Sequence, residues 1–136
     1  TTVNLNSLAY VLVRSGQKEK ALEVCQRSKS ILPLTELSFQ GIIEYYYYTG
    51  DMANAEKELR EYVVKFSNDN FAYYLLASIC GSDNREEECF KYLDLAFANG
   101  FNDLDVIHSD KNLAQIISNN TYYDLLKKYG LPTERK

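Results

Sequence analysis

The chain has 136 residues, of which 46% are hydrophobic and 25% charged, and its formal net charge is −4. This composition is typical of a globular protein large enough to form a core without a metal or a disulfide, and its acidic balance argues against a nucleic-acid partner. The longest apolar runs, such as residues 8–13, fall far short of the roughly 20 residues that span a bilayer, so we expect no membrane insertion.

Three cysteines and one histidine form no CxxC pair and no His cluster, so we expect no metal site and no cofactor. Cys25, Cys80 and Cys89 are expected in the core, where a thiol behaves as a small hydrophobe. The composition favours a cytoplasmic protein. Because the chain begins without Met, a removed leader or an upstream domain stays open, and so does export.

The sequence repeats at a spacing of 34 residues. Apolar, small and turn residues recur in register along the chain. Examples are the triplets Leu12, Tyr46 and Cys80; Gly16, Gly50 and Asn84; Ala21, Ala55 and Cys89; and Cys25, Leu59 and Leu93.

The recurring Gly or Asn suits a left-handed helix cap, so each repeat is predicted to be a helix, a tight turn and a second helix. Pro33 is expected to end the first repeat, because a helix cannot continue through it. The predicted helices are 3–15 and 18–31, 36–49 and 52–66, and 70–81 and 85–98, the last opened by the acidic run Arg85-Glu86-Glu87-Glu88.

The remaining segment, from residue 104, has its own pattern. Asp110 is predicted to cap a short helix that carries Leu113, Ile116 and Ile117, and His108 is expected in the connection before it, at the surface or in the cap. A capping box that begins at Thr121 predicts a last helix ended by Gly130.

The stretch 44–51, EYYYYTGD, together with the downstream Ala55, resembles the tetratricopeptide repeat, whose unit is about 34 residues long. The resemblance implies an all-α, right-handed α/α superhelix (solenoid) of three helix-turn-helix units in a single domain, residues 1–136. The repeats would cover about 2–35, 36–69 and 70–103. Residues 104–130 are similar to the closing segment of many bacterial members, and 131–136 would be a frayed tail.

The same resemblance implies a non-catalytic protein-protein interaction module that presents a concave, tyrosine-rich groove to an unidentified peptide or protein segment. The chain contains no glycine-rich phosphate loop, GxSxG or HExxH motif, so no catalytic residue is expected. The groove would be lined by residues of the first helix of each repeat: Asn6, Tyr10, Val13, Arg14, Gln40, Glu44, Tyr47, Tyr48, Phe71, Tyr74, Ser78 and Ser82.

These tyrosines could instead pack only on neighbouring helices or on the tail. A helix turns about 100° per residue, so the four tyrosines cannot share one face. Tyr46 is predicted in the core, Tyr45 toward neighbouring helices, and Tyr47 and Tyr48 toward the groove. The carboxylate clamp of chaperone-binding family members is not supported, because the face offers Asn6 and Arg14 but no Lys.

Two other functions stay open. The helix 3–15 has hardly any polar side, which favours a structural assembly element that forms a homodimer or packs on upstream repeats through this helix. The chain could also be a regulatory appendage of an upstream enzyme domain.

Overall fold

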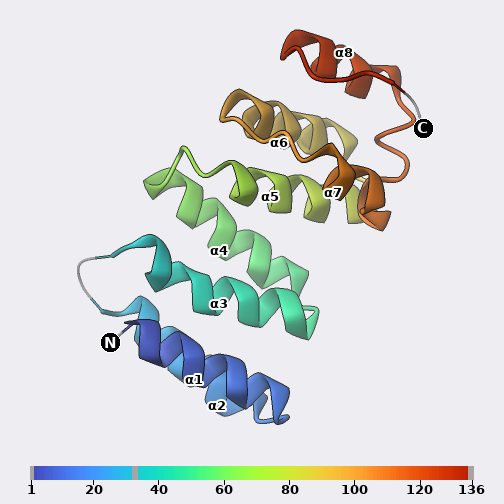
Figure 1. Cartoon of the computed structure of the whole chain (residues 1–136). Helices are drawn as coiled ribbons and strands as arrows, with labels where there is room; N and C mark the ends of the chain where they lie inside the picture. Colours follow the sequence, from blue (N-terminus) through green and yellow to red (C-terminus); the bar gives the residue numbers. More distant parts are fainter. Residues whose placement is uncertain (1, 32–33, 135–136) are drawn as a thin grey trace. The chain divides into compact units, whose positions relative to one another are not determined.

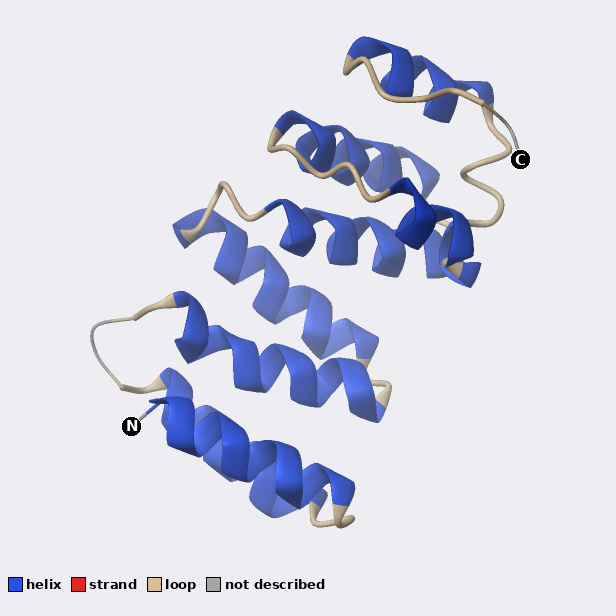
Figure 2. Cartoon of the chain, in the orientation of Figure 1, coloured by secondary structure: helices blue, strands red, loops and turns tan. Residues whose placement is uncertain are grey.

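The computed structural model describes residues 2–31 and 34–134, and the side chains of residues 7–31 and 34–134. Within these ranges the secondary structure comprises eight α-helices and one short 3-10 helix, with no strand (Figure 2). The all-α prediction is therefore confirmed. None of the described helices combines the length and the apolar character needed to cross a membrane.

The chain divides into two compact units, Thr1–Phe66 and Ser67–Lys136. The first contains α1 (Thr2–Arg14), α2 (Lys18–Lys29), α3 (Glu36–Thr49) and α4 (Met52–Lys65). The second contains α5 (Asn70–Ser82), α6 (Glu86–Ala98), α7 (Leu104–Ser109), the 3-10 helix η1 (Lys111–Leu113) and α8 (Asn120–Lys128). Figure 1 labels the α-helices in chain order.

The first six helices form three consecutive pairs, each joined by the same tight turn (Figure 1). Gly16 and Gly50 have φ values of 82° and 83°, and Asn84 has the corresponding left-handed value of 56°. One backbone hydrogen bond closes every turn, from Gln17 N to Leu12 O at 2.8 Å, from Asp51 N to Tyr46 O at 2.9 Å, and from Arg85 N to Cys80 O at 2.9 Å. The predicted helix-turn-helix units are thus present at the predicted places.

The core of the first unit joins the two helix pairs. Ala9, Cys25 and Ile42 form a buried cluster, contributed by α1, α2 and α3. Phe39 is fully buried, with its ring 5.6 Å from that of Tyr62 on α4. Small side chains at the helix contacts let the backbones approach closely, which is why the 34-residue pattern alternates small and large apolar residues.

In the second unit, α5 packs along α6 and the C-terminal segment covers the pair. An ideal Cβ at Gly81 would lie 2.5 Å from the backbone oxygen of Asn112, so η1 approaches α5 where the helix has no side chain. The helix α8 packs on α6, where Asp94 accepts hydrogen bonds from the Tyr129 hydroxyl and, at 3.1 Å, from Lys128.

Three details of the C-terminal segment differ from the prediction. The helix α7 was not expected; Asp103 caps it, and its Ile107 is fully buried, so packing stabilises a helix too short to persist alone. Asp110 caps η1 as predicted, but the helix stops at Leu113, and residues 115–118 form turns. The cap of α8 is Asn119, whose side chain accepts from Thr121 N at 2.9 Å, so the predicted capping box is wrong.

Pro33, which was expected to end the first repeat, lies outside the described residues.

Candidate functional site

A pocket of about 320 Å³ lies between α1 and α3 in the first unit. Four residues of each helix line it. They are Ala9, Tyr10, Val13 and Arg14 from α1, and Gly41, Glu44, Tyr45 and Tyr48 from α3.

The spacing of these residues explains why they meet. Glu44 and Tyr45 lie three and four residues after Gly41, and Tyr48 lies four and three residues after them, so the four residues occupy one face of α3. Buried Ala9 faces this side of α3 from α1. Because Ala9 and Gly41 are small, they leave a space between the two helices, and the longer side chains one turn away line this space. The two helices therefore provide a hollow with aromatic walls and one charge of each sign.

The charged side chains of the pocket already have partners. Arg14 donates from Nη1 to the Tyr10 hydroxyl at 3.1 Å, and its guanidinium lies 5.5 Å from the centroid of the same ring. Glu44 accepts from Gln40 Nε2 at 3.0 Å. Both contacts join residues four apart on one helix, so each side chain is oriented by its own helix.

Acidic side chains act on Tyr45, which lines the pocket, and on Cys25. Burial raises the pKa of Tyr45, and Cys25, Asp51 and Glu19 raise it further. Burial, with a contribution from Glu44, raises the pKa of the Cys25 thiol to about 11. Both groups are consequently uncharged at neutral pH.

Five of the predicted groove residues in the first unit line this pocket: Tyr10, Val13, Arg14, Glu44 and Tyr48. Tyr10 and Tyr48 are 52% and 69% exposed, so their rings are accessible from solvent.

Two other predicted residues of this unit, Gln40 and Tyr47, lie outside the pocket lining. Gln40 orients Glu44, and the half-buried Tyr47 has its ring 6.3 Å from that of Tyr48. The side chain of Asn6 lies outside the described residues.

The predicted groove residues of the second unit are placed differently. Phe71 and Ser82 are exposed, but Tyr74 and Ser78 are buried. Both hydroxyls donate to Asp110 Oδ2 at 2.7 Å, and the Tyr74 ring stacks on Phe101 at 5.1 Å. The C-terminal segment of the same unit therefore covers this part of α5.

Tyr45, Ala9 and Gly41 line the pocket although the sequence pattern did not assign them to the groove. Tyr45 and Tyr46 pack against the buried cluster of the first unit, as predicted, with their rings 5.3 Å apart. Tyr45 does both, because it is only half-buried. Its position one residue after Glu44 and three before Tyr48 was the signal that could have identified it.

The cysteines lie in the core as expected, whereas His108 lies in the unexpected helix α7 and not in a connection. Cys25, Cys80 and Cys89 are buried. His108 lies in the last turn of α7, where its Nε2 is 3.0 Å from the hydroxyl of the buried Tyr122. All four residues thus contribute to packing or to the C-terminal segment.

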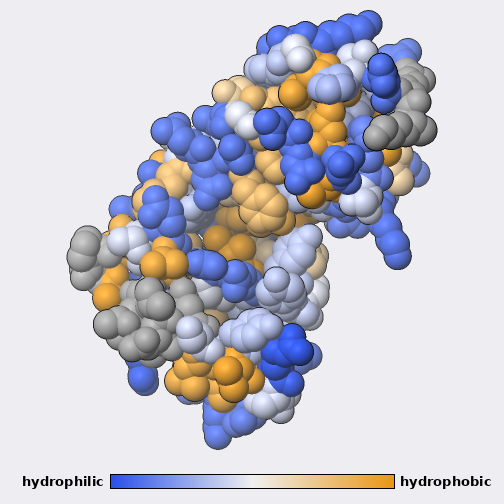
Figure 3. All heavy atoms as spheres, in the orientation of Figure 1, coloured by the Kyte–Doolittle hydropathy of each residue, from blue (hydrophilic) through white to orange (hydrophobic). Residues whose placement is uncertain are grey.

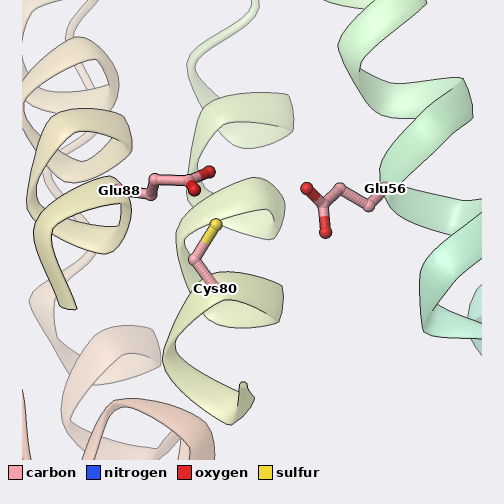
Figure 4. A group of neighbouring side chains, drawn as sticks. All are labelled: Glu56, Cys80 and Glu88. Atoms are coloured by element: carbon pink, nitrogen blue, oxygen red, sulfur yellow. The ribbon is translucent and has the colours of Figure 1, made fainter. Parts of the chain in front are cut away.

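Figure 4 draws Cys80 on α5 and Glu88 on α6, together with Glu56 of the first unit. Glu88 pairs with Arg85 at 3.3 Å within the second unit, and Glu56 pairs with Arg60 at 2.7 Å within the first. Cys80 and Glu88 offer their own unit two ligand atoms, whereas a structural zinc site takes four. These carboxylates are accounted for by ion pairs.

No protein-family model, curated protein or solved structure matches the chain. Its function is therefore inferred from its own residues and geometry.

Proposed function

We propose that the chain is a tetratricopeptide-like solenoid of three helix-turn-helix units that binds a peptide or protein segment and catalyses no reaction. The recurrence of one turn hydrogen bond at 34-residue spacing, after Leu12, Tyr46 and Cys80, supports the repeat assignment. Helical repeats of this kind use the exposed face of their first helices for recognition.

The observation that carries the proposal is the pocket between α1 and α3. Its accessible rings, Tyr10 and Tyr48, supply large and rigid contact area with a polar hydroxyl at the edge. Its volume of about 320 Å³ lies at the lower end of the range for small-ligand sites, which suits one or two side chains of a longer segment. We infer that a partner inserts side chains here and lies along α1 and α3.

The test is a selection from a displayed library of random peptides, followed by calorimetric titration of the enriched sequences. The first protein is the wild type, and the second carries Tyr10→Ala and Tyr48→Ala. Both positions are more than half exposed, so the double substitution should leave the fold intact. Truncation of two aromatic anchors should weaken the binding affinity of the selected peptides about tenfold or more.

Val64→Ala is the matched control, because Val64 is 83% exposed on α4 and does not line the pocket. It should bind the selected peptides like the wild type. Peptides that bind wild type and double variant equally well would contradict the pocket as the binding site. Tyr74, another predicted groove residue, is not substituted in this test, because its removal would take away contacts with Asp110 and Phe101 within the second unit.

A second candidate function is assembly through α1. Leu8 and Val11 are 47% and 59% exposed on this helix, and hydrophobic atoms gather over α1 in the space-filling view (Figure 3). An exposed apolar helix face is a place where a second copy or a further repeat can pack.

Sedimentation of wild type and of a Leu8→Ser, Val11→Ser variant tests this candidate. Assembly predicts a ligand-independent dimer that dissociates in the variant, since the substitutions remove the apolar contact. A wild type that stays monomeric at high concentration would exclude self-association.

A further inference from the structure

The chemistry of the pocket walls suggests which side chain the partner inserts. The faces of tyrosine rings are electron-rich and attract organic cations that lie within about 6 Å. Arg14 already shows this within the chain, because its guanidinium lies 5.5 Å from the Tyr10 centroid. One wall of the pocket thus holds a guanidinium on a tyrosine ring.

The opposite wall has a second tyrosine ring and a carboxylate, which is the charge complementary to a cation. Tyr48 is 69% exposed, and the Glu44 carboxylate lies one helical turn before it on the same face of α3. The partner that the structure describes for this carboxylate is the neutral Gln40 amide. A cation placed at Tyr48 would therefore be within reach of a ring and of a carboxylate.

The charges around this wall favour the same sign of ligand. Asp51 and Glu19 raise the pKa of Tyr45, which lines the same wall as Glu44, so the charged groups that act on this ring are acidic. The basic member of the pocket is Arg14, which is held at Tyr10 on the α1 side.

We propose that the pocket binds an arginine side chain of the partner segment, with its guanidinium over Tyr48 and paired with Glu44. This inference rests on the proposed peptide-binding function. Arginine fits better than lysine, because its planar group stacks on an aromatic ring and donates to a carboxylate through two parallel N–H groups.

Three peptide probes, each blocked at both ends, test the proposal: Gly-Gly-Arg-Gly-Gly, the same sequence with citrulline, and the same sequence with glutamate. Citrulline keeps the shape and planarity of arginine but lacks its charge. Binding is followed by titration in amide correlation spectra of the whole chain, with the signals of Gly41 and Tyr48 as reporters. The arginine peptide should shift these signals at the lowest concentration, and citrulline should bind about fivefold more weakly.

Glu44→Gln keeps the size of the side chain and removes its charge. It should weaken the affinity for the arginine peptide about fivefold and leave the affinity for the citrulline peptide unchanged. Glu36→Gln is the matched control, since Glu36 is exposed on the same helix, about 12 Å from Glu44 along the axis and outside the pocket lining. It should bind all three peptides like the wild type.

The possible failures are distinguishable. If the glutamate peptide binds as tightly as the arginine peptide, or if Glu44→Gln has no effect on the arginine peptide, the cation assignment is overturned and the peptide-binding function stands. If none of the three peptides shifts the pocket signals, while a peptide selected from the library does, the cation assignment alone falls. If neither shifts them, the proposed function falls with it.

Discussion

Tyr74 and Asp110, 36 residues apart, are joined by a 2.7 Å hydrogen bond from the tyrosine hydroxyl to Oδ2 of the carboxylate. The same oxygen accepts from Ser78 at 2.7 Å, and Oδ1 accepts from the backbone of Asn112 at 2.9 Å. One carboxylate therefore fastens η1 to α5 and caps η1 as well.

Asp110→Asn should destabilise the second unit. The amide keeps the size of the side chain but is uncharged, so both the Tyr74 and the Ser78 hydroxyls lose an ionised acceptor. It also offers a single acceptor oxygen, so either these hydroxyls or the Asn112 backbone N–H lose their acceptor. Hydrogen bonds to a charged group contribute about 1.5–3 kcal/mol, so a loss of about 2 kcal/mol in the free energy of unfolding is expected. Urea unfolding followed by circular dichroism measures it. Asp105→Asn, at an exposed position in α7, is the control, and an equal effect of both would contradict the assigned role.

Gly50→Ala should destabilise the turn between α3 and α4. Nothing lies within 4 Å of an added Cβ, so the cost comes from the φ of 83° alone and should be about 1 kcal/mol. Gly50→Asn should cost less, because Asn84 adopts a positive φ at the equivalent turn. Thermal unfolding of the three proteins checks the order. An alanine variant as stable as the wild type would show that the left-handed turn is not required.

The Lys29 ion pairs should stabilise the first unit in a pH-dependent manner. Burial lowers the pKa of Lys29, but its hydrogen bonds to Glu58 at 2.6 Å and Glu61 at 3.0 Å raise the pKa by more, so the net shift is upward. A raised pKa in the folded state stabilises the fold fully below the unfolded pKa of about 10.4, and this stabilisation is lost as the pH rises through the folded pKa.

Lys29→Gln should therefore lower the free energy of unfolding by about 1–2 kcal/mol at neutral pH, because buried Glu58 loses its charged partner. The difference from wild type should shrink as the pH rises above about 10.4. Urea midpoints measured across this pH range provide the test. Lys20→Gln, on the exposed side of α2, should change little at any pH. A difference that persists unchanged at alkaline pH would contradict the ion pair.

The buried thiols should be nearly inert in the native state. Burial raises the pKa of Cys25 to about 11 and that of Cys89 to about 12, with smaller contributions from nearby acidic groups. Both are therefore protonated at neutral pH, and alkylation requires the thiolate. Iodoacetamide should modify them about 100-fold more slowly in the native protein than in urea, measured by mass spectrometry.

The positive control for the thiols is Ser67→Cys, because Ser67 is exposed. Its introduced thiol should react at the same rate with and without urea. Native Cys25 that reacted as fast as this introduced thiol would contradict its burial.

The sequence by itself was sufficient to predict the helix pairs. The turns at Gly16, Gly50 and Asn84 depend on the backbone of a few neighbouring residues, and the apolar spacing of each helix depends on its own period. Such local preferences are readable from the chain. The predicted ends of α1 to α6 differ from the observed ends by at most two residues.

Tertiary structure decided which of the exposed-looking side chains are accessible. Tyr74 and Tyr10 were both predicted to face the groove from the first helix of their repeats, but Tyr74 is buried by residues 101 and 110 of its unit, whereas Tyr10 lies at an open pocket. Tyr45 joined the pocket because Ala9 and Gly41 bring α1 and α3 close together. These outcomes depend on contacts between segments far apart in the chain, so the periodicity of one helix cannot specify them.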